Sequence, residues 1–584
     1  MCGIAGIVAA PGRTVSRESL DLLNGRLHHR GPDERGAMVA DDGHLGLAMC
    51  RLRIIDLAGG QQPIANEDET VWVVFNGEIY NFPALRAGLI ERGHRFRTHS
   101  DTEVLVHLYE EHGDALVDYL DGMFAFAIWD VRRDRLLLAR DRFGEKPLYY
   151  TFVDGQLFYA SEMRALLPEM RQRRLNPQAL LQYLLLDYVP SPASIVSGIS
   201  KLPPGHLAVY ERGELSVRPY WRLRYAPKLT LSFADAAVEL HERLLQSVKR
   251  RLVSDVPLGT FLSGGLDSST LVALMVEAGA PDIQTFAVAI DSPSYDEGAY
   301  AAAVARQLGT THHEIRLRAT DMSALLAESG RYLDEPLADA SVVPTYLLSR
   351  LTREHVTVAL SGDGGDEILG GYPTYLAHQL AGWVPNGPWL GALRGLVDRL
   401  PAGERYMSWE FKAKRFLDGL GQPLPERHAR WMGSFNLPTL LPVLQPDLRA
   451  LAVTGLLSEM TAWDAGGDAR DAAERAMQLD IRYYLGDDLL VKADRASMAC
   501  SLEVRAPFLD HTLVEWMARL PVSLKGPRRP YKALLKQAMG TALPDVVRQR
   551  GKQGFGLPLT AWLKHELRPM VEEYLDPARL DRQG

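Results

Sequence analysis

The segment 257-PLGTFLSGGLDSSTLVAL-274 joins a short apolar run to an apolar helical pattern through a turn rich in Gly and Ser. Pro257–Leu262 predicts a strand and Ser268–Ala278 predicts a helix. Gly264 and Gly265 allow close approach of the backbone, and N–H groups at the start of a helix attract anions. Because neither G-x-x-x-x-G-K-[ST] nor G-x-G-x-x-G occurs here, the segment predicts an anion-binding strand–turn–helix unit of another kind.

Strand and helix patterns alternate on both sides of this segment. Helices are expected over Phe233–Arg251 and Gly298–Leu308, and strands over Gln284–Ile290, His313–Leu317 and Val356–Leu360. The strand runs are short and unbroken, as in strands that are covered on both faces. They predict an α/β domain with a doubly wound parallel sheet, to which Leu, Ala and Arg at helical spacing add helices after about residue 375.

A second turn, 361-SGDGGDE-367, has the same layout and also follows a predicted strand. Asp267 and Asp366 are therefore expected at the carboxyl ends of parallel strands, where open α/β sheets bind ligands. Mg²⁺ typically takes one or two carboxylates together with phosphate oxygens and water. The two turns thus predict a site for Mg²⁺ and a phosphate compound.

The first 205 residues follow another pattern, in which Asn, Asp and Gly punctuate short β-like runs. These runs are Gly3–Ala9, His44–Asp56, Thr70–Phe75, Met123–Trp129, Arg135–Ala139 and Gln156–Ala160. Helical patterns interrupt them at Pro83–Arg92 and Asp101–His112, so we expect antiparallel sheet with helices packed on it. A Pro-rich passage follows, which predicts a first domain over 2–205, a linker over 206–229 and a second domain over 230–584.

The composition is that of an ordinary globular protein. The chain has 584 residues, too many for one domain, and 65 basic against 73 acidic residues give a formal charge of −8. Hydrophobic residues at 46% and charged residues at 24% argue against disorder and coiled coil. The mildly acidic balance gives no electrostatic reason to expect a nucleic-acid partner.

Three cysteines, Cys2, Cys50 and Cys500, cannot form a disulfide framework in a chain of this size, which favours a reducing cytoplasm. Cys50 and Cys500 are expected to be small buried residues. No apolar run approaches the roughly 18 residues of a membrane span, so no membrane partner is expected.

Cys2 is the first candidate for catalysis. If the initiator Met is removed, the thiol lies beside an α-amino group whose pKa of about 7.7–8.0 suits a general base. The alternative is an ordinary small apolar residue. A turn expected at 76-NGE-78, directly after the strand 71-VWVVF-75, offers an amide and a Gly N–H for an oxyanion. Glu78 and Asp101 suit the α-ammonium group of an amino acid, and Arg51 suits its α-carboxylate.

The first half resembles the glutaminase domain of class II glutamine amidotransferases. The motifs that carry this resemblance are 2-CGI-4, 29-HRGPD-33, 51-RLRIID-56, 76-NGEIYN-81 and 100-SD-101, in this order. The resemblance implies an α+β fold of the N-terminal-nucleophile type with αββα layers. It also implies that Cys2 attacks the glutamine amide and that Asn76 and Gly77 form the oxyanion hole.

The same resemblance implies the residues that hold glutamine, which are Arg51, Asn76, Glu78 and Asp101. The second half resembles the pyrophosphate-loop ATPases, which cleave ATP between its α and β phosphates. The ATP-binding residues that this implies are Ser263, Gly264, Gly265, Asp267, Ser268, Val288, Ser361 and Gly362. Asp267 and Asp366 are implied as Mg²⁺ ligands.

The whole chain resembles the glutamine-hydrolysing asparagine synthetase family. Further matching passages are 285-TFAVAI-290, 295-YDEGAYAAAVARQLGTTHHE-314, 492-KADRASMACSLEVRAPFLD-510 and 531-YKALLK-536. By this resemblance Lys532 is catalytic and faces the acyl-adenylate and pyrophosphate. Glutamine, ATP and a carboxylic acid, foremost aspartate, are the implied substrates, and a homodimer is compatible with the family. Lys492, Asp494, Arg495 and Arg505 are expected to form a structural ion-pair network.

The acceptor acid is left open by 334-DEPLADASVVP-344. Leu337, Ala338 and Ala340 stand where some members carry two Thr and an Arg associated with aspartate, and Asp363 replaces a Glu. Three hypotheses follow: asparagine synthesis, the same chemistry on another acid such as a cell-wall precursor or secondary metabolite, or a non-catalytic scaffold or regulatory protein.

Overall fold

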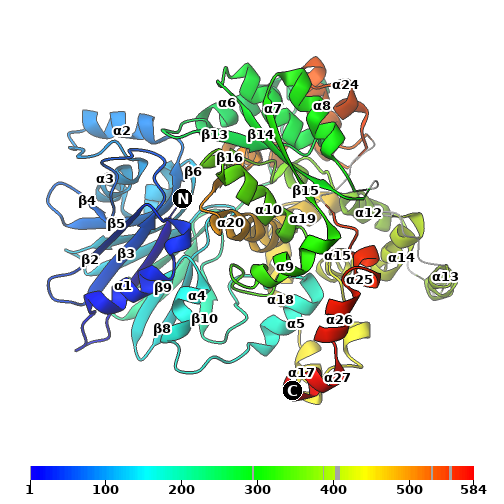
Figure 1. The fold of residues 1–584 in the computed structure, drawn as a ribbon, viewed down its shortest axis with the longest axis horizontal. Coiled ribbons are helices and arrows are strands. Elements are labelled where there is room, and N and C mark those ends of the chain that lie inside the picture. The colour runs from blue at the N-terminus through cyan, green and yellow to red at the C-terminus, as the bar shows by residue number, and fades with distance from the viewer. Residues whose placement is uncertain are drawn as a thin grey trace.

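The computed structural model describes residues 2–292, 295–385, 387, 389–400, 408–527, 530–551 and 556–583. The first 220 residues form one half of the molecule and the later residues form the other (Figure 1). The N-terminal end lies where the two halves meet, whereas the C-terminal end lies at the lower edge of the view in Figure 1. The residue expected to act as nucleophile is therefore close to the interface.

Two six-stranded sheets form the first half. The first sheet has the order β10 (Ile199–Lys201), β8 (Tyr149–Val153), β9 (Gln156–Ala160), β1 (Gly3–Val8), β3 (Leu45–Arg51) and β2 (Glu34–Val39). The second has the order β12 (Glu214–Pro219), β11 (His206–Glu211), β7 (Arg135–Arg140), β6 (Gly122–Asp130), β5 (Val71–Ile79) and β4 (Ile64–Ala65). Neighbouring strands within both sheets are antiparallel, as predicted.

Helices cover the outer faces of both sheets. α1 (Arg17–Gly25) shares an apolar cluster with β1 and β3, and α3 (Val104–His112) shares another with β5 and β6. A third cluster, which includes Ile4 and Val74, lies between the two sheets. α2 (Phe82–Glu91) lies beside α3. This helix–sheet–sheet–helix order confirms the predicted αββα layers.

Local sequence explains where several of these elements begin and turn. The dipeptide 154-DG-155 joins β8 to β9 with φ angles of 53° and 78°, the left-handed pair that a two-residue hairpin requires. Ser100 caps the 3-10 turn Asp101–Glu103 by accepting a hydrogen bond from the Thr102 N–H. α3 follows that turn, so the helix predicted at Asp101–His112 divides into two parts.

One local prediction is wrong. Residues 76–78 are not a turn, because β5 continues to Ile79 and pairs Asn76, Gly77 and Glu78 with the start of β6. Asn and Gly are poor strand formers, and the pairing with the long strand β6 overrides that preference. The side chains of Asn76 and Glu78 consequently project from a rigid strand.

The stretch 206–229 is also more structured than a linker. Its first part forms β11 and β12, and β11 pairs with β7, so this hairpin extends the second sheet of the first half. We therefore propose that the first domain ends near residue 219. The connection 220–232 then leads to α6 (Phe233–Arg251).

A five-stranded parallel sheet organises the second half. Its order is β15 (Thr311–Leu317), β14 (Gln284–Ile290), β13 (Leu258–Phe261), β16 (Val358–Leu360) and β17 (Glu503–Arg505). The direction in which strands are added reverses between β13 and β16. The carboxyl ends of these two strands flank the crevice in which such sheets bind ligands.

Both faces of this sheet are covered by helices, which confirms the doubly wound α/β fold. α6, α7 (Leu266–Glu277) and α8 (Gly298–Leu308) lie on one side. α10 (Val342–Arg353) and α20 (Leu490–Met498) lie on the other, over β14 and β17. α6 starts at Ser232, whose side chain accepts the Asp235 N–H, and carries basic residues in its last turn.

The added helices lie between β16 and β17 in the chain. They include α12 (Pro373–Ala381), α13 (Trp389–Asp398), α14 (Trp409–Gly419), α15 (Leu424–Met432), α17 (Pro446–Ala452), α18 (Ser458–Ala465) and α19 (Ala472–Leu479). α5 (Pro177–Leu186) from the first half packs against α15 and α17. The helical region therefore binds the two halves together.

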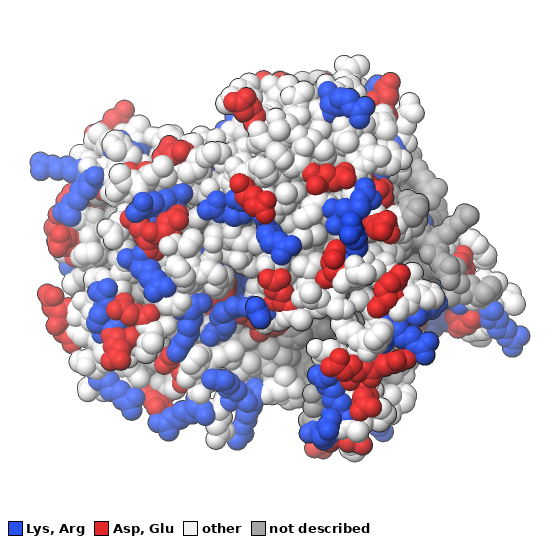
Figure 2. Space-filling model, in the orientation of Figure 1, with Lys and Arg blue, Asp and Glu red and all other residues white. Residues whose placement is uncertain are grey.

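The surface carries charges of both signs. On the face in Figure 2, Lys and Arg are interspersed with Asp and Glu, and no continuous basic stripe crosses the part of the face that is described. Among the described helices, a search for one that is both long and apolar enough to cross a bilayer finds none.

Candidate active sites

Cys2 is held in place through its own backbone just before β1 begins. Its N–H donates to Oδ1 of Asn76 at 2.9 Å, and its carbonyl accepts from Nε of Arg30 at 3.1 Å. The side chain is buried, and this burial raises the pKa of the Cys2 thiol. A thiol in this position needs a neighbouring base to become a nucleophile.

Asn76 and Gly77 lie beside Cys2 on β5. The Asn76 side chain is fully buried, and its Nδ2 has no hydrogen-bond partner among the described residues. A buried donor without an acceptor costs about 1–3 kcal/mol, so its presence needs an explanation. A negatively charged oxygen near Cys2 would supply the acceptor. Gly77 has no room for a side chain, because a Cβ would lie 2.1 Å from the Met123 carbonyl oxygen.

Glu78 and Asp101 form a buried acidic pair at the same end of β5. Oδ2 of Asp101 accepts the Ile79 N–H at 2.9 Å, and Oε2 of Glu78 accepts from Nη2 of Arg505 at 3.0 Å. Burial and the charge of Asp101 raise the pKa of Glu78 well above its usual value, while Arg505 opposes the rise. Burial raises the pKa of Asp101 to about 6. An added ammonium group would therefore be favoured here.

Arg51 is also buried, and it has partners of its own. Nη1 donates to Glu34 at 2.8 Å, and Nη2 donates to the carbonyls of Ile55 and Asp56 at 2.9 and 2.7 Å. Sequence reasoning missed Glu34, and it placed Arg505 in an ion-pair network without predicting its contact with Glu78. Glu34 directly follows the 29-HRGPD-33 motif, whereas nothing local connects Arg505 with β5.

The second site begins at the turn between β13 and α7. The Gly265 N–H donates to Oγ of Ser263 at 3.2 Å, and the Ser263 N–H donates to Oγ of Ser268 at the same distance. Gly264 has a φ of +70°, and a Cβ there would lie 2.6 Å from Cβ of Tyr300. The turn is thus closed on itself by hydroxyl groups at the start of α7.

Lys532 joins the two acidic residues predicted as metal ligands. Its Nζ lies 2.6 and 2.7 Å from the carboxylate oxygens of Asp267 and 2.6 Å from Oδ1 of Asp366. The space is tight, because a Cβ on Gly371 would lie 1.9 Å from that Asp366 oxygen. Two carboxylates at the ends of adjacent strands fit the oxygen ligands that Mg²⁺ prefers.

The other residues predicted to contact ATP are Gly362, Ser361 and Val288, and their surroundings differ. Gly362 lies close to Asp267, since a Cβ on it would be 3.2 Å from Cβ of Asp267. Oγ of Ser361 donates to Asp363 at 2.9 Å. The Val288 side chain is buried in the apolar cluster beneath α10, so a contact with a nucleotide would have to come from its backbone.

The sequence predicted an ion-pair network for Lys492, Asp494, Arg495 and Arg505, and the structure has ion pairs there, some of which also connect the two halves. Arg30 binds both carboxylate oxygens of Asp494 at 2.7 and 2.8 Å. Arg495 lies 3.2 Å from Glu162 and 3.1 Å from Asp334, and Lys492 donates to Asp339 at 2.8 Å. These contacts confirm a structural network.

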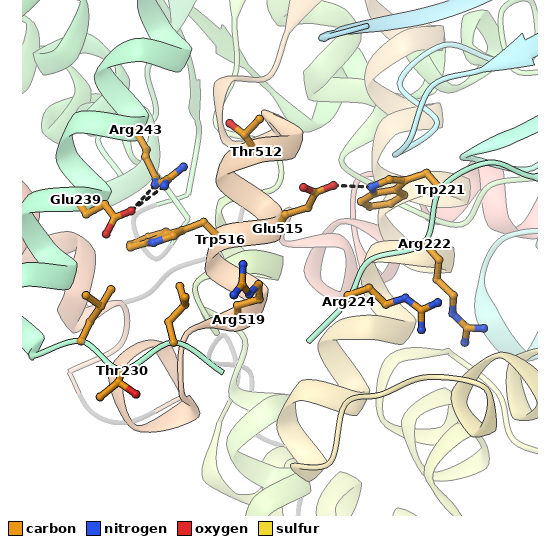
Figure 3. A pocket seen from close by; sticks show the side chains of 12 residues that line it. Trp221, Arg222, Arg224, Thr230, Glu239, Arg243, Thr512, Glu515, Trp516 and Arg519 are labelled. Atoms are coloured by element: carbon orange, nitrogen blue, oxygen red, sulfur yellow. Dashed lines mark hydrogen bonds and ion pairs between the residues drawn. The ribbon is translucent and has the colours of Figure 1, made fainter. Parts of the chain in front are cut away.

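A surface groove of about 580 Å³ lies elsewhere, between the connection 221–231, α6 and α21 (His511–Arg519) (Figure 3). Trp221 donates to Glu515 at 2.7 Å on one side, and Arg243 pairs with Glu239 on the other. None of the predicted site residues lines this groove.

The two folds and their sites define a glutamine amidotransferase joined to an ATP-utilising synthetase. Comparisons with protein families agree: the model described as "Glutamine amidotransferase domain" matches residues 1–221, and "Asparagine synthase" matches residues 239–584. The chain belongs to the glutamine-hydrolysing asparagine synthetase family and is a ligase of the amidotransferase type.

Similar curated proteins span nearly the whole chain. "Asparagine synthetase [glutamine-hydrolyzing] 1" of Bacillus subtilis is 33% identical over 592 residues, with 100% of this chain and 91% of the relative covered. A putative asparagine synthetase of Mycobacterium tuberculosis H37Rv is 34% identical, with 97% and 88% covered. "Amidase chry2" of Gibberella zeae is 28% identical, with 100% and 93% covered.

Two solved structures have low overall similarity. Glutamine phosphoribosylpyrophosphate amidotransferase of B. subtilis has a TM-score of 0.29 at 15% identity, covering 63% of this chain and 77% of that one. NH3-dependent NAD synthetase of Campylobacter jejuni has a TM-score of 0.18 at 13% identity, covering 39% and 95%.

Proposed function

We propose that this chain uses ATP and glutamine to convert a carboxylic acid, foremost aspartate, into its amide. The observation that carries the proposal is the pairing of two reactive centres in one chain, of which the first is buried and the second is partly buried. Cys2 lies beside the unpartnered amide donor of Asn76, and Lys532 lies between Asp267 and Asp366. The first centre would release ammonia from glutamine, and the second would use ATP to activate the carboxylic acid.

At the first centre, removal of the initiator Met would free the α-amine of Cys2. One N–H of this amine would remain hydrogen-bonded to Oδ1 of Asn76. The lone pair of the amine would then accept the proton of the Cys2 thiol. The sulfur then attacks the side-chain carbonyl of glutamine, and Asn76 Nδ2 and the Gly77 N–H stabilise the oxygen that becomes negative. Ammonia leaves, and water hydrolyses the resulting thioester to glutamate.

The substrate clamp is assigned to the three charged residues around this centre. The α-ammonium of glutamine would lie against Glu78 and Asp101, where Arg505 is the only cation that the structure shows bound to Glu78 among the described residues. The α-carboxylate would bind Arg51 in a bidentate manner after Arg51 exchanges one of its present contacts. Glutamine would therefore add one positive charge beside the acidic pair and one negative charge beside Arg51.

At the second centre, the phosphates of ATP would lie against the Ser263–Ser268 turn. Asp267 and Asp366 would hold Mg²⁺, which neutralises phosphate charge when it is bound. The acceptor carboxylate attacks the α-phosphate, pyrophosphate leaves, and an acyl-adenylate forms. Lys532 offsets the charge that grows on the phosphates. Ammonia from the first centre then displaces AMP and forms the amide.

The region around Lys492 favours a second candidate, in which the acceptor is another acid. Lys492 is already bound to Asp339 and Ser341, and Asp363 and Asp488 lie near it. Ala338 and Ala340 add no positive charge. Because this site has less positive charge than a site with an additional Arg, it would bind the side-chain carboxylate of aspartate more weakly.

A screen of candidate acids tests the function. The purified chain would receive glutamine, MgATP and one acid at a time, and AMP and pyrophosphate would be measured by chromatography. We expect stoichiometric AMP with aspartate, and no AMP from the Lys532→Met control. AMP formation with another acid but not with aspartate would select the second candidate. No AMP with any acid would refute the synthetase assignment.

A further inference from the structure

Four potential metal ligands converge on the outer side of the glutaminase half, in a region that the proposed reaction does not use. Glu67 follows β4, His94 follows α2, and His107 and Glu110 lie one turn apart on α3. One donor atom from each lies within 4.8 Å of the other three. Three separate chain segments thus bring two imidazoles and two carboxylates to one point.

The spacing of these atoms matches a tetrahedral ion. Nδ1 of His107 lies 3.1 Å from Glu110 and 3.5 Å from Glu67, and Nδ1 of His94 lies 3.6 Å from Glu110 and 3.7 Å from Glu67. Zinc bonds of about 2.0–2.1 Å place tetrahedral ligands about 3.3–3.4 Å apart. The three separations that involve Oε2 of Glu67 or Oε2 of Glu110, at 3.1, 3.5 and 3.6 Å, bracket that value, whereas the 3.7 Å separation is measured to Oε1 of Glu67. A rotation of the Glu67 carboxylate would bring one of its oxygens toward both histidines.

Each imidazole has a second carboxylate behind it. Nε2 of His94 lies 3.1 Å from Glu111, and Nε2 of His107 lies 3.8 Å from Glu103. A proton on Nε2 of His94 would be donated to Glu111 and leave its Nδ1 lone pair directed at the cluster. Nε2 of His107 is buried and has no hydrogen-bond partner among the described residues, so Glu103 orients this imidazole by charge only. This arrangement of carboxylate, histidine and metal is the usual way in which proteins orient a ligating imidazole.

The two carboxylate ligands are also oriented by neighbours. Oε1 of Glu110 accepts from Nδ2 of Asn66 at 2.9 Å, and Oε1 of Glu67 accepts the Arg95 N–H at 2.7 Å. Oε2 of Glu110 faces both histidines, whereas Glu67 presents Oε2 to His107 and the same Oε1 to His94. Glu103 and Glu111 add two further carboxylates around the imidazoles, so the centre of the cluster favours positive charge.

We propose that Glu67, His94, His107 and Glu110 bind one divalent transition-metal ion, for which Zn²⁺ is the best match. Two nitrogen and two oxygen donors suit zinc better than Mg²⁺ or Ca²⁺, which prefer oxygen ligands only. The ion would join the loop at His94 to α3 and to the turn after β4. Because this loop continues to Asp101, the metal would brace one wall of the glutamine site from outside.

Metal titration of the full chain tests the proposal. After treatment with EDTA and its removal, ZnCl2 is added and binding is followed by calorimetry and by metal analysis of the dialysed protein. We expect one tightly bound equivalent. His94→Asn and Glu110→Gln should each weaken binding at least 100-fold, and the outer variant Glu111→Gln should weaken it about 10–100-fold.

His99→Asn is the matched control, because His99 lies exposed in the same loop but outside the cluster, and it should bind zinc as the unaltered chain does. Co²⁺ provides a second readout, with visible ligand-field bands and no thiolate charge-transfer absorption. Circular dichroism confirms that each variant is folded. Absence of a stoichiometric ion, unchanged binding in His94→Asn, or a thiolate band would each overturn the proposal.

Discussion

Oε2 of Glu78 in the glutaminase sheet lies 3.0 Å from Nη2 of Arg505 in β17 of the synthetase sheet. The same arginine donates to Glu503 and to the backbone carbonyls of Arg251 and Val253. Its own carbonyl accepts the N–H of Ser361, in the turn that is assigned to ATP. One residue therefore contacts parts of both proposed centres.

Arg505→Met should disturb stability and glutamine use together. Breaking a buried ion pair on one side costs about 3–5 kcal/mol, since Glu78 would keep an uncompensated charge. We expect a lower free energy of unfolding in urea and a changed KM for glutamine. Adding Glu78→Gln should restore part of the stability. If the Arg505→Met variant and the unaltered chain have the same free energy of unfolding, the contact between Arg505 and Glu78 contributes nothing to stability.

Cys2→Ala should abolish amide synthesis driven by glutamine but leave synthesis driven by ammonium salts intact. The variant lacks only the sulfur of the first centre, and the ATP-binding turn lies in another domain. Product formation from glutamine and from ammonium chloride can be compared in one amide assay. Parallel loss of both activities would rule out separable centres.

Asn76→Ala should slow glutamine hydrolysis by roughly 10²–10³, the usual effect of losing one oxyanion donor. The loss should appear in kcat, because Nδ2 is needed most when the oxygen is charged. Asn76 also binds the Cys2 N–H, so Asn76→Asp serves as the comparison that retains an acceptor but removes the donor. A change below tenfold in glutamate release would assign Asn76 a purely structural role.

Glutamine binding should weaken in acid as Asp101 takes up a proton. Burial raises the pKa of Asp101 to about 6, so the charged form that attracts an ammonium group is lost as pH falls through 6. KM for glutamine should then rise by up to about tenfold per pH unit. The same shift makes the contribution of Asp101 to stability decrease as pH rises from about 4 to 6, because folding favours its protonated form.

Asp101→Asn is the control for this pH effect. Its KM for glutamine should be higher at neutral pH and nearly independent of pH between 5 and 7. A KM profile with the same acid limb as the unaltered chain would assign the titration to another group.

Lys532→Met should remove AMP formation with either nitrogen source while glutamine hydrolysis persists. Without the ammonium group, Asp267 and Asp366 repel each other and should bind Mn²⁺ more tightly in the absence of nucleotide. Electron paramagnetic resonance can measure free Mn²⁺. If the Mn²⁺ affinity is unaltered, Asp267 and Asp366 are not ligands of the metal.

The sequence was most informative where local patterns and tertiary structure agree. Helix α6, strand β14 and helix α8 have the predicted bounds, because each has a continuous apolar pattern of a single period. The pattern at residues 76–78 failed, since pairing with β6 decides that backbone. β17 was missed because three residues carry too little periodicity to be recognised.

The residues of the two candidate sites were likewise predicted where the sequence carries a local signal. Cys2, Asp267 and Asp366 were found from residue type and neighbouring turns, and the structure brings each to a buried centre. The contacts of Arg505 with Glu78 and of Arg30 with Asp494 span more than 400 residues and leave no local signal. Such partners become visible only in three dimensions.

The late position of β17 gives the chain a definite order of assembly. On the ribosome, the glutaminase sheets can form before residue 503 is synthesised, yet the carboxylate of Glu78 then has no Arg505 beside it. Nascent protein released before this point would carry an acidic, unbalanced inner surface. Completion of about the last seventh of the polypeptide therefore turns two half-molecules into one enzyme.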